Sequence, residues 1–312
     1  MNPIFSEAIA EIASDNRSGA AQIAERAADI LLRRAGTGEA ASPDAFRQEL
    51  LATGWALIRA QPIMAPLVNL VNAVLWKLEE RETPAELRLA IAQATEEFKR
   101  QLRQNALRVA EGALGLIADG STIITISHSG TVEQALLHAR RVGRRFAVIC
   151  LESRPACEGR EAAAALAASD IPTTLAVDAA AAALVKEAQL VLVGADLLSN
   201  RGLVNKVGSR SLALAAQAEG VPFYTLCGGE KFLPPGYCPP NQQAWPSGEV
   251  WADAPHGVTV RNYYFEWTPL EELSGIVTEQ GTLPVGAVEG WLAAIKLHPA
   301  LASGGLELAE GA

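Results

Sequence analysis

Residues 122–151, TIITISHSGTVEQALLHARRVGRRFAVICL, decide the fold class. The β-prone run at 122–127 predicts a buried strand, residues 131–142 follow a helical pattern, and the apolar run at 146–151 predicts a second strand. Strands with almost unbroken apolar residues, joined by a helix, are typical of a parallel sheet covered on both faces. This stretch therefore predicts an α/β fold.

The same alternation continues toward the end of the chain. Further strands are predicted at 173–177, 189–193, 223–226 and 275–278, and further helices at 159–168, 179–187 and 208–219. No GxGxxG follows the first strand, so the dinucleotide-binding fingerprint is absent. The Gly- and Pro-rich residues 227–262 are too long for an ordinary connection and predict an ordered excursion.

The first 118 residues follow a helical pattern throughout. Ser18 precedes an alanine-rich helix that ends near Gly36, in the manner of an N-cap. Ser42 and the Pro43 after it predict a second helix start, and Thr83–Glu86 (TPAE) is a capping box before a long helix with one apolar stripe. We therefore predict an all-helical domain at 1–118 and an α/β domain with a mainly parallel sheet at 119–312.

The composition excludes several classes of protein. The formal net charge of -9 is unsuited to a nucleic-acid binder, which needs a basic face. No apolar run reaches the roughly 18–20 residues that span a bilayer, and the N-terminus does not resemble a signal peptide. We therefore expect a cytoplasmic protein with no nucleic-acid or membrane partner. The four cysteines and four histidines lack metal-site spacing, so neither a metal nor a cofactor is expected.

Polar residues follow four of the predicted strands, at the sheet edge where ligands bind in such folds. They are Ser127 and Ser129, then Glu152 to Arg154, then Asp178, then Asp196. Ser129 and Asp178 have a simpler alternative role as helix caps. Asp196 ends the apolar run LVLVGAD, where an ionisable group is costly unless it serves a purpose.

Five segments carry a resemblance to a known family: NRSGAAQIAERA (16–27), LESRPACEG (151–159), GADLLSNRGLVNKVGS (194–209), EKF (230–232) and NYYFEWTPLEELSGIVTEQG (262–281). They resemble the alpha, beta and delta subunits of translation initiation factor 2B, a family that includes ribose-1,5-bisphosphate and methylthioribose-1-phosphate isomerases. The resemblance implies a helical N-terminal domain, a Rossmann-like C-terminal domain that dimerises, and a phosphosugar pocket between the domains.

In the isomerases of that family a cysteine after the first strand and the aspartate of GAD move protons between the first two sugar carbons. The resemblance places Asp196 at the aspartate and Ser127 at the cysteine, which makes these two the catalytic candidates if the chain is an enzyme. A serine cannot take the role of the thiol without a strong local base. His128 is adjacent, but a Ser127–His128 dyad requires that the strand has already turned, because neighbours in a strand face opposite ways.

Three further positions depart from the isomerase pattern. Ser18, followed by Gly19 and Ala20, stands where the isomerases have the arginine of an RGA motif, and Gln61 replaces a second arginine. These losses weaken recognition of a phosphate dianion. Arg201 stands at the usual asparagine after GAD, where it either restores positive charge near the site or lies on the surface.

An anion pocket is still predicted. Arg154, Lys206 and the amides of Gly130 and Thr131 at a helix start are suited to a phosphate. Arg154 in a surface ion pair and Lys206 as a solvated loop residue are the alternatives. The ligand-binding candidates are Ser18, Gly19, Ala20, Gln61, Ser129, Gly130, Thr131, Arg154, Asn205 and Lys206.

Three functions remain open from the sequence. The first is a protein like initiation factor 2B that binds a phosphorylated sugar or nucleotide without the isomerase chemistry, which the serine at 127 favours. The second is an aldose–ketose isomerase of a sugar phosphate that uses Asp196 and Ser127. The third is a non-catalytic scaffold. For each of them we expect a homodimer or a higher homo-oligomer.

Overall fold

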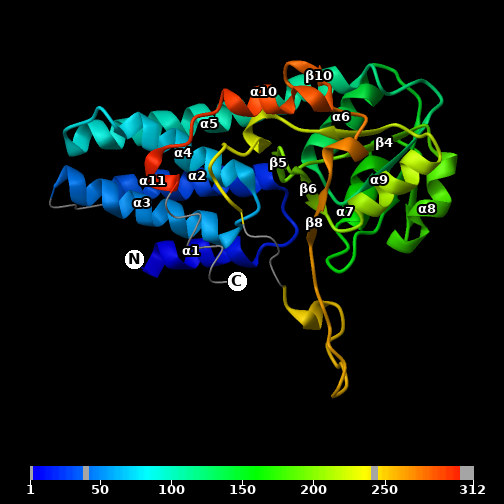
Figure 1. Ribbon diagram of the computed structural model, residues 1–312, viewed down its shortest axis with the longest axis horizontal. Helices are drawn as coiled ribbons and strands as arrows, with labels where there is room; N and C mark the ends of the chain where they lie inside the picture. Colours follow the sequence, from blue (N-terminus) through cyan, green and yellow to red (C-terminus); the bar gives the residue numbers. More distant parts are fainter. Residues whose placement is uncertain (1–2, 38–41, 240–244, 303–312) are drawn as a thin grey trace. The chain divides into compact units, whose positions relative to one another are not determined.

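The computed structural model describes residues 3–37, 42–239 and 245–302 (Figure 1). Within the described part, no helix is both long and apolar enough to cross a membrane.

The chain forms two compact units. The helical unit draws on Met1–Gln104, Glu230–Pro240 and Leu292–Ala312, and the sheet unit on Asn105–Gly229 and Asn241–Trp291. These bounds differ from a single cut after residue 118. One long helix runs through the first boundary, and two later segments belong to the helical unit.

The helical unit is built from α1 to α4, the first part of α5, and α11. Their bounds are α1 Pro3–Ser14, α2 Ala20–Thr37, α3 Pro43–Ala60, α4 Ala65–Leu78, α5 Pro84–Ala113 and α11 Pro299–Ala302. α1 packs on α2 and α3, and α4 packs on the same two helices (Figure 1). The predicted stripe of α5 is buried at Leu87, Ile91 and Phe98 in this unit.

Helix starts in this unit follow the predicted capping chemistry with one exception. The Ser42 hydroxyl accepts the Ala45 N–H at 3.2 Å and caps α3. At α5 the Glu86 carboxylate accepts the Thr83 N–H at 3.0 Å, and Thr83 Oγ1 accepts the Glu86 N–H at 3.3 Å. The prediction that Ser18 is the N-cap of α2 was wrong, because α2 begins at Ala20 and Gly19 is the residue before it.

The sheet unit contains the predicted parallel sheet, in the order β10-β9-β7-β4-β1-β2-β3. Its strands are β1 Thr122–Ile126, β2 Ala147–Leu151, β3 Thr173–Ala176, β4 Leu190–Val193, β7 Phe223–Leu226, β9 Gly275–Thr278 and β10 Gly281–Leu283. Only β10 runs antiparallel to its neighbour within this sheet. Its helices are the end of α5, then α6 Gly130–Arg141, α7 Gly159–Ala167, α8 Ala181–Leu184, α9 Ser209–Ala218 and the first part of α10, whose bounds are Val288–Ala293.

The order of the strands reverses between β1 and β4. From β1 the chain proceeds to β2 and β3 on one side, and from β4 it proceeds to β7 on the other. Right-handed crossovers then place α6 and α7 on one face of the sheet and α8 and α9 on the other. Consistently, α6 contacts α7 and α8 contacts α9. Ligands of such sheets bind at the carboxyl ends of the two strands that flank this reversal, which here are β1 and β4.

A second sheet was not predicted. It has the order β5-β6-β8 and is antiparallel, with bounds Leu197–Ser199, Gly202–Lys206 and Phe265–Thr268. The predicted helix at 179–187 is also broken, because 3-10 turns at Asp178–Ala180 and Val185–Glu187 flank the short α8. The excursion at 227–262 contains 3-10 turns at Gly229–Lys231 and Ser247–Glu249, and its residues 240–244 lie outside the described part.

Candidate functional site

The segments that leave β1 and β4 touch each other at the reversal of strand order. Ile124 of β1 pairs with Val191 of β4 in parallel register. Beyond the strands, a Cβ added to Gly194 would lie 2.3 Å from Ser129 Oγ, so only glycine permits this close approach. Asp196 follows two residues later. It is half-buried, and its N–H donates to the Val204 carbonyl at 3.0 Å.

Ser127 leaves β1 with a turned backbone. Its φ of 70° lies in the left-handed region, which is uncommon for a residue other than glycine. Its N–H donates to Ser153 Oγ at 2.7 Å, and its hydroxyl donates to Glu158 Oε1 at 2.8 Å. The strand has therefore turned, as a dyad with His128 would require, but the hydroxyl is directed at Glu158.

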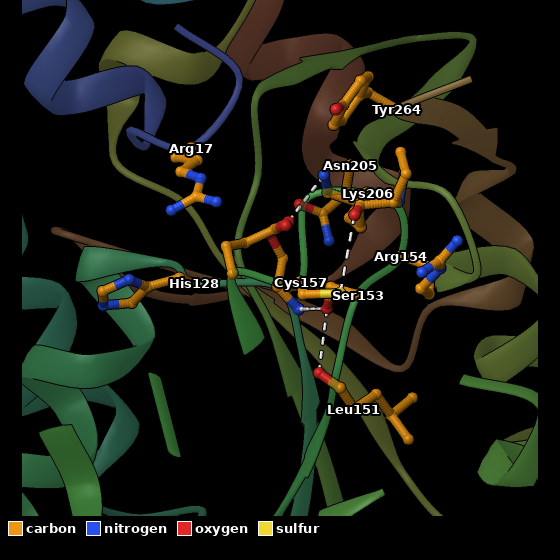
Figure 2. Close-up of polar contacts among 12 residues, drawn as sticks. Arg17, His128, Leu151, Ser153, Arg154, Cys157, Asn205, Lys206 and Tyr264 are labelled. Atoms are coloured by element: carbon orange, nitrogen blue, oxygen red, sulfur yellow. Dashed lines mark hydrogen bonds and ion pairs between the residues drawn. The ribbon is translucent and has the colours of Figure 1, made fainter. Parts of the chain in front are cut away.

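His128 points away from this group (Figure 2). Its Nε2 lies 2.7 Å from Glu133 Oε2, and its Nδ1 lies 3.9 Å from Glu161 Oε2. The hydrogen bond with Glu133 raises the pKa of His128 above its ordinary value, although partial burial opposes the shift. His128 thus belongs to an acidic surface cluster with the two glutamates.

The loop after β2 is held by Asp178. Its Oδ1 accepts the Ser153 N–H at 2.8 Å, and its Oδ2 accepts the Arg154 N–H at 2.7 Å. Ser153 is buried and has a φ of 66°. Both oxygens of Asp178 are therefore engaged with the loop backbone, so its role is to position the loop that carries Glu158.

Gly159 fixes the end of this loop. A Cβ at this position would lie 1.9 Å from the Leu151 carbonyl oxygen, a distance that no side chain tolerates. The first turn of α7 can therefore press against the end of β2. This packing carries Glu158, the residue before α7, into the interior, where it is only 2% exposed.

Glu158 forms a buried ion pair with Lys206. Lys206 Nζ lies 2.7 Å from Glu158 Oε1, and the Lys206 side chain is 3% exposed. The ammonium also lies 4.4 Å from the centroid of the Tyr264 ring; Figure 2 labels both residues. It lies 5.6 Å from the centroid of the Phe265 ring, and both contacts are cation–π interactions. The alternative of a solvated Lys206 was therefore wrong. Glu158 Oε2, by contrast, has no hydrogen-bond partner among the described residues.

Asn205 is buried beside Lys206 and braces the strand. Its Nδ2 donates to Ser209 Oγ at 2.9 Å, and the Ser209 hydroxyl donates to the Lys206 carbonyl at 2.6 Å. These bonds tie β6 to the first turn of α9. The turn between them passes through Gly208, whose φ of 102° is in the left-handed region.

The start of α6 lies on the same edge of the sheet. Ser129 Oγ accepts the Val132 N–H at 3.4 Å, so Ser129 caps this helix as its alternative role predicted. Gly130 and Thr131 are its first residues, and Gly130 is exposed. Arg154 is also exposed, and its Nη2 lies 3.4 Å from the Val250 carbonyl oxygen. The role of these residues in holding a phosphate stays a prediction.

Arg201 lies on the small sheet. Its side chain is exposed, and its guanidinium carbon is 4.4 Å from the centroid of the Trp267 ring. This contact is a cation–π interaction.

The candidates of the helical unit gather around Asp15. Gln61 Nε2 donates to the carbonyls of Ile12 and Asp15, both at 2.9 Å. Asp15 Oδ1 accepts the N–H of Ser18 at 2.8 Å. Burial raises the pKa of Asp15, but hydrogen bonds from Ser18, Arg17 and Arg26 outweigh it and hold the pKa below its ordinary value. Gly19 follows this turn, and α2 begins at Ala20.

Metal and thiol chemistry receive no support from the described residues. No group of three or more His, Cys, Asp or Glu side chains is placed there to hold a metal ion. None of the four cysteines, all of which lie in the described part, forms a disulfide: Cys150, Cys157, Cys227 and Cys238. Burial raises the pKa of Cys150 to about 12, so that thiol is inert as a nucleophile.

Comparison with known proteins identifies the family. The model of the initiation factor 2 subunit family matches residues 16–285. The chain belongs to the initiation factor 2 subunit family. A ribose 1,5-bisphosphate isomerase of Haloterrigena turkmenica is 33% identical over 290 residues, which cover 88% of each chain. A ribose 1,5-bisphosphate isomerase of Archaeoglobus fulgidus is 32% identical over 287 residues, which cover 89% of each chain.

A solved structure of this family supports the same assignment. The translation initiation factor eIF-2B of Pyrococcus horikoshii superposes with a TM-score of 0.79 and 28% identity, covering 91% of this chain and 98% of that one. The resemblance inferred from the motifs is therefore confirmed, and so is the α/β fold with an N-terminal helical region. Relatives within the family carry both enzyme and translation-factor names.

Sequence reasoning missed Glu158 and Tyr264. Both lie in stretches that carried the family resemblance, and Glu158 was visible there as an ionisable residue next to Gly159. Its role depends on Lys206, which is distant in sequence and is brought to it by the unpredicted small sheet. A local pattern contains no signal for such a partner.

Proposed function

We propose that this member of the family is a sugar-phosphate isomerase that converts an aldose phosphate of the ribose 1,5-bisphosphate class into the ketose. The observation that carries the proposal is the placement of Ser127 and Asp196 just beyond the carboxyl ends of β1 and β4. These strands flank the reversal of strand order, where ligands bind in such sheets. Isomerisation needs a proton acceptor and a proton donor on one bound sugar.

The named relatives support the substrate class. Two proteins named ribose 1,5-bisphosphate isomerase are 32% and 33% identical over nearly nine-tenths of the chain. The exposed start of α6 is suited to one phosphate of such a substrate, because backbone N–H groups at a helix N-terminus attract anions. Arg154 adds a cation on the same edge.

A second candidate function is binding without conversion. The serine at 127 favours it, since a hydroxyl alone is a far poorer proton carrier than a thiol with a pKa of about 8.5. Such a protein would bind a phosphorylated sugar or a nucleotide without converting it, and its effect would depend on whether that ligand is bound. A scaffold that binds no small molecule is the weakest candidate, because it does not require a buried ion pair at the edge of the sheet where ligands bind in such folds.

Replacement of Asp196 by Asn tests the proposal. We expect the wild type to convert ribose 1,5-bisphosphate, and Asp196→Asn to lower kcat by roughly 10²-fold or more, because the amide cannot transfer the proton. Methylthioribose 1-phosphate is the competing substrate. The matched control is Asp170→Asn, at an exposed position with a φ of 57° that asparagine also adopts.

The two candidate functions give different outcomes in this assay. Conversion that disappears in Asp196→Asn and persists in Asp170→Asn supports the isomerase. Thermal stabilisation by a sugar phosphate or nucleotide, with no conversion by the wild type, supports binding alone. A ligand at one hundred times its Kd should add about 2.7 kcal/mol to the free energy of unfolding.

A further inference from the structure

The cluster of Ser127, Glu158 and Lys206 has a function beyond holding the loop after β2. We propose that Glu158 is the proton acceptor of the site, that Ser127 relays the proton to it, and that Lys206 is the positioning residue that holds Glu158 beside Ser127. This inference rests on the proposed isomerase function. It names the base that a serine at position 127 requires.

Hydrogen-bond chemistry fixes the direction of the relay. Glu158 Oε1 lies 2.7 Å from the Lys206 ammonium and 2.8 Å from Ser127 Oγ. A carboxylate paired with an ammonium is an acceptor only, so the Ser127 hydroxyl must direct its proton at Glu158. The lone pairs of Ser127 Oγ are then left for a proton that comes from a ligand.

The burial of the three side chains supports the same direction. Glu158 and Lys206 are buried, whereas Ser127 is partly exposed at the end of β1. A ligand at the sheet edge therefore reaches the hydroxyl before it reaches the carboxylate. Ser127 connects the accessible edge to a base that solvent does not reach.

Two features of the cluster suit a carboxylate that gains and loses a proton. Glu158 Oε2 is buried without a hydrogen-bond partner among the described residues, and an unpaired buried oxygen is costly unless it serves a purpose. When Glu158 takes up a proton, the Lys206 ammonium still faces the rings of Tyr264 and Phe265 at 4.4 Å and 5.6 Å. These cation–π contacts stabilise the ammonium while its partner is neutral.

The reaction balances with these groups alone. In the first step the C2–H bond of the sugar breaks, and its electron pair forms a double bond between C1 and C2. The bond between C1 and the ring oxygen breaks at the same time. The C2 proton passes to Ser127 Oγ while the hydroxyl proton moves to Glu158 Oε1, and Asp196 protonates the ring oxygen. In the second step the C2 hydroxyl returns a proton to Asp196, and Glu158 returns one through Ser127 to C1. Ser127 never becomes an alkoxide.

The test combines Glu158→Gln, Ser127→Ala and Ser127→Cys, with ribose 1,5-bisphosphate as the substrate. We expect Glu158→Gln and Ser127→Ala each to lower kcat by about 10²-fold or more while KM changes by less than about threefold. The double variant Ser127→Ala/Glu158→Gln should be no slower than either single one, because the two residues act as a unit. Glu219→Gln, an exposed glutamate at the end of α9, is the control.

A thiol at position 127 separates the relay from a structural role. A cysteine holds and releases the proton itself near neutral pH, so it does not need Glu158. Ser127→Cys/Glu158→Gln should therefore be at least about tenfold faster than Glu158→Gln alone. Failure of the thiol to restore activity would mean that Glu158 only holds the loop, and that result overturns the relay.

The remaining outcomes also decide between the proposals. Wild-type conversion that Glu158→Gln leaves unchanged overturns the relay and keeps the isomerase. No conversion by the wild type overturns the isomerase, and the relay with it. If Glu158→Gln does not fold, Ser127→Ala carries the test, because it leaves the ion pair intact, and full activity in that variant overturns the relay.

Discussion

Lys206 and Glu158 stabilise each other as a buried ion pair. Two buried charges are stable only as a pair, because removal of one partner leaves the other desolvated and uncompensated. Their exposures of 3% and 2% place them in that class. The pair also shows the limit of residue-level prediction, since Lys206 was singled out as a phosphate ligand while Glu158 was overlooked.

Lys206→Met tests this dependence. We expect the free energy of unfolding to fall by about 3–5 kcal/mol, because Glu158 is left as an unpaired buried carboxylate. Denaturant titration followed by circular dichroism measures the change. Lys186→Met, at an exposed lysine in a 3-10 turn, should change stability by less than about 0.5 kcal/mol. A loss of under about 1 kcal/mol in Lys206→Met would contradict the account of the pair.

The sequence predicted the candidate site unevenly, for physical reasons. Ser127 and Asp196 follow apolar runs, and such runs mark where strands end, so their positions were accessible from the pattern. Asp178 was predicted as a cap or a ligand, yet it holds the loop of Ser153 and Arg154 from a neighbouring strand end. These two hydrogen bonds join residues 25 and 24 positions apart in the sequence, and local sequence patterns do not predict partners at that separation.

At the scale of elements, the six parallel strands were predicted to within about two residues at each end. Their apolar runs are nearly unbroken because helices cover both faces of the sheet. The short strands β5, β6, β8 and β10 were missed. β5 and β10 have three residues each, which is too short for a periodic pattern to form.

The turn from β2 into α7 depends on one glycine. Gly159→Ala would place a Cβ against the Leu151 carbonyl, so the loop must shift, and we expect a loss of about 1–3 kcal/mol in the free energy of unfolding. Because the same loop carries Glu158, conversion of ribose 1,5-bisphosphate should fall as well. Thermal unfolding and the isomerase assay measure the two effects.

Gly290 in α10 offers a matched control for Gly159. A Cβ there meets nothing within 4 Å, and alanine is the better helix former. Gly290→Ala should therefore be neutral or stabilising by about 0.5–1 kcal/mol. Equal stability of the Gly159 and Gly290 variants would show that the close approach to β2 is not needed.

At the scale of the whole molecule, segments late in the chain join the helical unit through specific bonds. Asn69 Nδ2 donates to the carbonyls of Glu230 and Phe232, both at 2.8 Å. Asn72 Oδ1 accepts the His298 N–H at 2.7 Å. A single domain boundary at residue 118 does not describe these later segments, which belong to the helical unit. The pattern of apolar residues carries no information on which unit a later segment joins.

Self-association is a prediction at this scale. The family resemblance implies a dimer, so light scattering at micromolar concentration should give a mass of at least twice the 32.9 kDa of one chain. The net charge of -9 opposes association at low salt, and the mass is best measured at about 0.15 M ionic strength, where the screening length is about 8 Å. A monomer at that concentration would be inconsistent with the prediction.

The central claim is that the hydroxyl at 127 and the carboxylate at 196 make a working isomerase. Nuclear magnetic resonance of ribose 1,5-bisphosphate, incubated with the purified wild type in D₂O, tests it most directly. We predict conversion to the ketose bisphosphate with the C2 proton carried to C1 in place of deuterium from the solvent, because the acceptor Glu158 is buried and returns the proton through Ser127. A sugar that is bound and released unchanged would contradict the claim.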